Sequence, residues 1–172
     1  MGWDVAIYGT VAAKAQELAA WMKSKPEYPK KMPADYPYTR MDLKTVDAVM
    51  NKLKSQATLF DMAAEKTGWS VRAVLDGGYH VQIGLDLAAA FNAAQALGLK
   101  AELVTYGWIT AGPGMAYRFA SGKTFSAKKL TDAEEKKLKA TKQVRELEQW
   151  IEDELAAQEK SRRPKTNGNE AG

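Results

Sequence analysis

The sequence contains no cysteine and only one histidine. The absence of cysteine excludes disulfides, thiolate metal ligands and cysteine nucleophiles, and it suits a reducing compartment. A single histidine cannot build a histidine-based metal centre within one chain. We therefore expect no metal site and no cofactor.

Long apolar runs are also missing. No stretch approaches the roughly 20 apolar residues that a membrane-spanning helix needs, and the start, Met1-Gly2-Trp3-Asp4, lacks the basic and then apolar order of a secretory signal. Apolar and charged fractions of 45% and 27% are typical of globular proteins. We expect a cytoplasmic protein without a membrane partner, with 172 residues available for a substantial core.

The most strongly patterned stretch lies between residues 69 and 108. Two alternating runs, Trp69–Leu75 and Tyr79–Leu85, flank Asp76-Gly77-Gly78 and predict a hairpin with a three-residue loop. This register places Val71, Ala73, Leu75, Tyr79, Val81 and Ile83 on one apolar face, whereas a two-residue loop would mix the faces. A helix capped by Asp86 and ended by Gly98 should follow, and then a strand over 101–106.

The flanking segments complete the expected order of elements. We expect a strand over 3–9, helices over 10–24 and 42–67, an edge strand over 115–119 and a long helix over 131–159. Residues 25–41 hold four of the six prolines and predict an extended loop. The polar residues 161–172 predict a disordered tail.

This order is that of a split β-α-β arrangement occurring twice, so the sequence predicts an α+β fold. The expected architecture is a ferredoxin-like sandwich with a broken first crossover, an extra edge strand and a long C-terminal helix, in one domain over 1–160. The apolar stripe of that helix (Val144, Leu147, Ile151 and Leu155) must be buried. We favour docking on the second face of the chain's own sheet over docking on a second copy.

Charge leaves two alternatives for the same helix. The net charge of +4 permits a polyanionic partner without requiring one. Basic residues gather before and early in the helix and acidic residues in its later half. Such a pattern is typical of a solvated helix face, but an antiparallel pair of identical helices would also match opposite charges, as in a homodimer through residues 131–159.

The polar face of the predicted sheet is the first candidate site. It would collect Asp4, Tyr8, Arg72, His80, Gln82, Glu102 and Tyr106. Such a face could hold a polar ligand, with His80 as general base or donor. The alternative is a face that is solvated, or covered by the C-terminal helix.

The proline-rich loop is the second candidate. It carries Tyr28, Tyr36, Tyr38 and Arg40, and tyrosine and arginine are favoured at protein interfaces. The loop is either a docking strip or a surface crossover whose tyrosines pack back on the helices.

No motif names a reaction. Ser121-Gly122-Lys123-Thr124 resembles the end of a phosphate-binding loop, but Tyr117 stands where that motif needs glycine. No nucleophile–base pair or carboxylate pair stands out. We therefore expect a small non-catalytic binding protein of regulatory or toxin-neutralising type, whose partner is another protein. The alternatives are a nucleic-acid-binding protein that uses its basic flanks and a small enzyme that uses His80.

Overall fold

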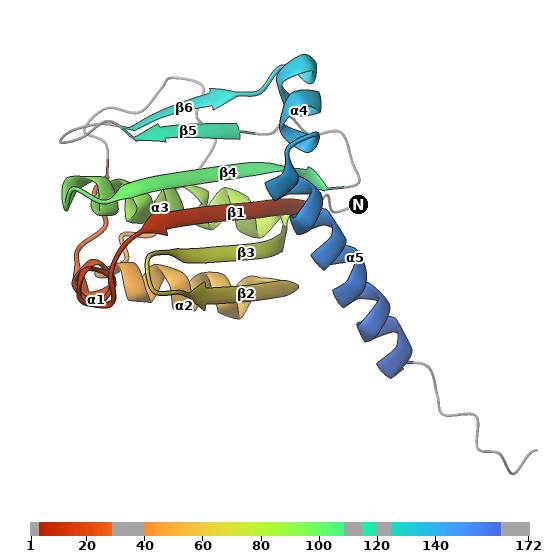
Figure 1. Cartoon of the computed structure of the whole chain (residues 1–172), viewed down its shortest axis with the longest axis horizontal. Helices are drawn as coiled ribbons and strands as arrows, with labels where there is room; N and C mark the ends of the chain where they lie inside the picture. Colours follow the sequence, from red (N-terminus) through yellow and green to blue (C-terminus); the bar gives the residue numbers. More distant parts are fainter. Residues whose placement is uncertain (1–3, 29–39, 109–114, 120–124, 163–172) are drawn as a thin grey trace, which may run out of the picture.

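The computed structural model describes residues 4–28, 40–108, 115–119 and 125–162, with residues 77, 78, 80–82, 107, 108, 115–119 and 125–129 described by their backbone (Figure 1). Its elements are, in chain order, β1 (Asp4–Ala12), α1 (Ala15–Lys23), α2 (Val46–Gln56), β2 (Leu59–Ala64), β3 (Trp69–Asp76), α3 (Gly77–Ala96), β4 (Lys100–Trp108), β5 (Met115–Phe119), β6 (Phe125–Lys129), α4 (Asp132–Lys139) and α5 (Lys142–Arg162).

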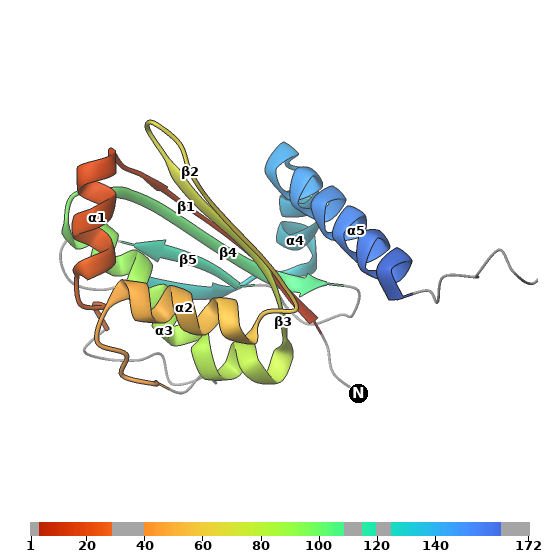
Figure 2. The same cartoon turned by 90° about the horizontal axis from the view of Figure 1, so that it is seen from below.

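The described strands form one antiparallel sheet of six strands, in the order β2-β3-β1-β4-β5-β6. Helices α1, α2 and α3 lie on one face, and α4 and α5 lie on the other (Figure 2). The predicted α+β class is confirmed. Because both faces of the sheet carry helices, strands such as β1 and β3 bury side chains on both faces.

The larger core lies between the sheet and the three helices α1 to α3. Alternate residues of β1, including Val5 and Ile7, point into it and are buried. Three aromatic rings pack at its centre: the Trp21 ring lies 4.9 Å from Trp69 and 5.7 Å from Phe91, edge to face. The Trp21 indole N–H donates a 2.8 Å hydrogen bond to the Ala90 carbonyl, which ties α1 to α3.

The smaller core lies on the second face, under α5. Val144, Leu147 and Ile151 are buried against a patch of the sheet. The sheet contributes Ala6, Leu59, Val74 and Tyr106. The prediction that the C-terminal helix docks within the chain is therefore confirmed, but the predicted burial of Leu155 is wrong, because the helix extends past the sheet patch that covers the other three residues.

The predicted hairpin around Asp76-Gly77-Gly78 is wrong. Strand β3 ends at Asp76 and α3 begins at Gly77, so residues 79–85 form the first part of a helix rather than a strand. The true hairpin joins β2 to β3, and the Glu65 amide donates to the Gly68 carbonyl across its turn. The helix predicted over 42–67 therefore ends at Gln56.

Three other boundaries differ from the predictions. Strand β1 continues to Ala12, so Thr10 lies within the strand and caps no helix. Strand β6 was not foreseen, and it pairs with the edge strand that was. The long C-terminal helix is broken at Ala140 and Thr141, where the Thr141 hydroxyl accepts from the Val144 amide and starts α5.

Two end signals are confirmed. Thr131 caps α4 by accepting a hydrogen bond from the Glu134 amide. Gly98 adopts a φ of 79° after α3, the left-handed conformation that favours glycine. Asp86, by contrast, lies inside α3 rather than at its start. The segment Ser121-Gly122-Lys123-Thr124 and most of the predicted tail lie outside the described residues.

Gly9 provides a test of how closely β1 and α3 pack. A Cβ atom at this position would lie 2.3 Å from Cζ of the buried Phe91 ring. We expect Gly9→Ala to lower the free energy of unfolding by about 1–3 kcal/mol through overpacking. Gly68→Ala is the control, because its nearest contact would be 3.9 Å away. Urea denaturation measures both, and equal values would contradict this packing.

The docking of α5 predicts a contrast within its apolar stripe. Leu147 is 1% exposed, whereas Leu155 is 38% exposed. We expect Leu147→Ala to cost about 2–5 kcal/mol of unfolding free energy, as deletions in a core do, and Leu155→Ala to cost much less. Chemical denaturation of the two variants checks this. A larger loss at Leu155 would show that the helix docks in another register.

Candidate functional site

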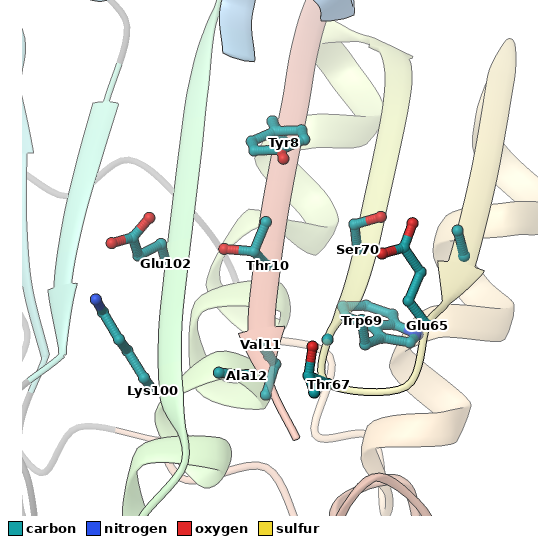
Figure 3. A pocket seen from close by; sticks show the side chains of 12 residues that line it. Tyr8, Thr10, Val11, Ala12, Glu65, Thr67, Trp69, Ser70, Lys100 and Glu102 are labelled. Atoms are coloured by element: carbon teal, nitrogen blue, oxygen red, sulfur yellow. The ribbon is translucent and has the colours of Figure 1, made fainter. Parts of the chain in front are cut away.

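A hollow of about 400 Å³ opens on the part of the second face that α5 leaves uncovered. Tyr8 and Thr10 of β1 and Ser70 of β3 lie on its floor, while Lys100 and Glu102 flank it from β4 (Figure 3). The turn of the β2–β3 hairpin forms the opposite side. This side carries Glu65 and Thr67.

Strand register explains why these groups meet. Thr10 of β1 lies opposite Ser70 on β3 and opposite Glu102 on β4. Side chains alternate along a strand, so Tyr8 and Thr10 share the face on which Ala6 contacts α5. The hollow is thus the continuation of the row that α5 covers.

The charged side chains of the hollow are not neutralised locally. In the described part of the chain, Glu65, Lys100 and Glu102 form no ion pair. The pKa of Tyr8 is raised, first by burial and then by the carboxylates of Glu146 and Glu102, against an opposing effect of Arg72. The hollow therefore combines hydroxyl donors and acceptors with a local excess of negative charge.

Arg72 marks the border between the hollow and α5. Its Nε donates to Asp61 Oδ2 at 2.8 Å, and its guanidinium lies 4.5 Å from the centre of the Trp150 ring. A guanidinium held between a carboxylate and an indole face links β2, β3 and α5. Both Arg72 and Trp150 keep part of their surface exposed.

The residues predicted for a polar sheet face lie in different parts of the structure. Tyr8 and Glu102 line the hollow and Arg72 borders it, whereas Tyr106 is 1% exposed beneath α5. Asp4 lies at the start of β1, opposite Asp76, and burial followed by that carboxylate raises its pKa.

The predicted positions of His80 and Gln82 are wrong, because their segment is helical and belongs to α3 rather than to the sheet. The prediction that His80 lies on the polar face of the sheet is therefore wrong. Sequence reasoning missed Thr10, Ser70 and Lys100. Extending the alternation of β1 beyond Gly9, and that of β3 back from Arg72, would have found the first two.

The residues predicted in the proline-rich loop serve a different contact. Tyr28 donates a hydrogen bond from its hydroxyl to Asp86, and the Arg40 guanidinium lies 3.8 Å above the Tyr28 ring. The Met41 amide also donates to Asp86, at 3.2 Å from both carboxylate oxygens. Tyr28 therefore packs back on α3, while Tyr36 and Tyr38 lie outside the described residues.

Asp86 is a buried carboxylate that fastens both ends of this loop to α3. Burial raises its pKa, partly offset by the hydrogen bonds from Tyr28 and Met41. Burial and the bond to Asp86 raise the pKa of Tyr28 as well. Through the carboxylate of Asp86, the network joins Tyr28 and Met41 to α3.

The described residues offer neither a metal-binding group nor a membrane-spanning helix. The described ranges contain no group of three or more histidine, cysteine, aspartate or glutamate side chains suited to a metal ion. None of their helices is both long and apolar enough to cross a membrane. Comparison of the chain with family models, with curated proteins and with solved structures found no match. The surface of the described residues is therefore the source of the functional proposal.

Asp86 predicts a pH dependence of stability. A raised pKa in the folded state means that folding favours the protonated form, so this contribution is full below the unfolded value of 3.8 and is lost as pH rises through the folded pKa. We expect Asp86→Asn to remove this pH-dependent loss of stability. The stability of the variant minus that of the parent should increase as pH rises from about 3 to neutrality.

Denaturation curves across this pH range measure the difference. Tyr28→Phe serves as the second variant, because removal of a hydrogen bond that lowers the pKa of Asp86 should steepen the dependence. A difference that stays flat, or that falls with pH, would contradict the burial of this carboxylate.

Proposed function

We propose that this chain is a small non-catalytic binding protein, and that a protein partner docks on the open half of the second sheet face. The observation that supports this most is the hollow of about 400 Å³, with a hydroxyl-bearing floor and three charged side chains that have no ion pair in the described ranges. These groups are solvated in the isolated chain and available for hydrogen bonds across an interface.

The character of the hollow favours a macromolecule over a small ligand. Small-molecule sites are usually enclosed and mostly apolar. This hollow is open, Glu65, Lys100 and Glu102 are exposed beside it, and only about half of its lining is apolar. Tyr8 lines the hollow, Arg72 lies opposite Tyr8 on β3, and Trp150 packs on the Arg72 guanidinium. These residue types are enriched among the residues that contribute most to protein–protein binding. Charges at the rim would then select the partner.

The proposal extends to the fold. Strands β2-β3-β1-β4, with α1 to α3 on one face, follow the order of a ferredoxin-like split β-α-β sandwich. On this interpretation β5, β6, α4 and α5 are additions, and α5 converts an open sheet face into a half-covered one. The fold by itself does not identify a function. The proposed regulatory or toxin-neutralising role in the cytoplasm is therefore supported by the binding surface and not by the fold.

The rival functions have less support. A polyanion would meet two carboxylates and one ammonium group in the hollow, so a nucleic acid would have to bind along the basic flanks, for example at Lys136 and Lys137 of α4. An enzyme that uses His80 on the sheet would need a strand where the chain forms α3.

The test compares the parent with variants that fill or invert the hollow. Thr10→Arg places a large side chain on the floor, and Glu102→Lys reverses a charge on the rim. We expect both to remain folded, because Thr10 is partly exposed and Glu102 is exposed. We also expect both to lose, by at least about tenfold in affinity, a protein that the parent retains on co-purification. Calorimetry with the purified partner measures the loss.

Lys160→Glu is the matched control, since it changes an exposed charge near the end of α5 that does not line the hollow. Partner binding that is unchanged by Thr10→Arg and Glu102→Lys would refute the assigned surface. Micromolar binding of an oligonucleotide at physiological salt, abolished by Lys136→Glu with Lys137→Glu, would support the nucleic-acid alternative instead.

A further inference from the structure

Strand β2 forms one edge of the sheet, and no described strand lies outside it. The Glu65 amide donates to the Gly68 carbonyl, so this pair is a hydrogen-bonded one. Hydrogen-bonded and non-hydrogen-bonded pairs alternate along an antiparallel ladder. Asp61 and Ala63 therefore direct their backbone groups toward β3, while Phe60, Met62 and Ala64 direct theirs outward.

The described part of the chain gives this edge little of the usual protection against pairing. Native edge strands are commonly blocked by proline, by lysine, by a bulge or by a charge that resists addition of another strand. The segment Leu59–Ala64 contains neither proline nor lysine, and its single charge, on Asp61, is already paired with Arg72 at 2.8 Å. Met62 leaves 46% of its surface exposed, a large apolar side chain at an open edge.

We propose that β2 pairs antiparallel with β2 of a second copy of this chain, about a two-fold axis at Met62. In this register the outward-directed groups of Met62 meet those of the same residue in the copy, and Phe60 meets Ala64. Asp61 then lies opposite Ala63. A register centred on Asp61 would instead place two carboxylates directly opposite each other, which is unfavourable.

The charges of α2 favour a second copy as the occupant. This helix lies in the helix layer at the β2 edge (Figures 1 and 2), and its exposed face carries Asp47, Asn51 and Lys54. A two-fold axis makes the two α2 helices antiparallel. The acidic start of one is then directed toward the basic end of the other, so that Asp47 and Lys54 are self-complementary.

The dimer uses the outer edge of β2 rather than the hollow, and the two surfaces adjoin at Ala63. It would join two sheets into one and bury Met62, while α5 and the hollow remain on the second face. It also replaces a dimer through residues 131–159, since the stripe of α5 is already used within the chain. Failure of either proposal leaves the other standing.

The lack of cysteine allows a direct test by single-cysteine cross-linking of the full chain. We expect Met62→Cys to give a covalent dimer with a short thiol-specific bifunctional reagent. Leu155→Cys, at an exposed position on α5, is the control and should stay largely monomeric. Cross-linking at position 155 but not at 62 would overturn the proposal in favour of a helix-mediated dimer.

Sedimentation equilibrium provides the second measurement. The parent and Met62→Leu should form dimers, and Met62→Lys, which opposes two like charges at the axis, should weaken dimerisation by at least about tenfold. Lys54→Asp should weaken it several-fold, and the double exchange Asp47→Lys with Lys54→Asp should restore it. A monomeric parent at the highest attainable concentration, or a dimer indifferent to Met62→Lys, would contradict the proposal.

Discussion

The structure depends on the burial of β1 from both sides. This central strand sends Val5, Ile7 and Val11 into the three-helix core and Ala6 toward α5. Gly9 lets the Phe91 ring approach the strand where any side chain would collide with it. The two cores therefore share one strand, and a shift of its register by one residue would exchange their contents.

The second core is limited in extent, and this limit creates the candidate site. Burial of Val144, Leu147 and Ile151 contributes about 1.5–3 kcal/mol of transfer free energy per side chain, which holds α5 on the sheet. Beyond them the same face becomes polar, with Thr10, Ser70 and their neighbours around the hollow. One helix thus covers part of the face and leaves the hollow open beside it.

Local patterns in the sequence predicted the class and the order of elements better than their positions. Residues 79–85 alternate and contain β-branched side chains, as strands do, yet they start α3. This helix is buried on nearly all sides from Ile83 to Ala94, so it has no polar face to reveal a helical period. Phe60 and Ala64 likewise continued the spacing of α2 by coincidence, although the chain leaves the helix at Ala57.

The site was predictable only in part for the same reason. Tyr8, Arg72 and Glu102 were assigned to the correct face because β1, β3 and β4 were recognised locally. The share of that face covered by α5 depends on where the helix breaks. The break at Thr141 follows from a threonine cap that competed with an otherwise continuous helical pattern.

Methyl NOE spectroscopy of the full chain tests the half-covered face most directly. The account predicts cross-peaks from the Ala6 methyl group to the α5 stripe formed by Val144, Leu147 and Ile151, and none from the Thr10 methyl group to α5. Cross-peaks from Thr10 to that stripe, or their absence from Ala6, would contradict the account, because the helix would then close the hollow or leave the sheet.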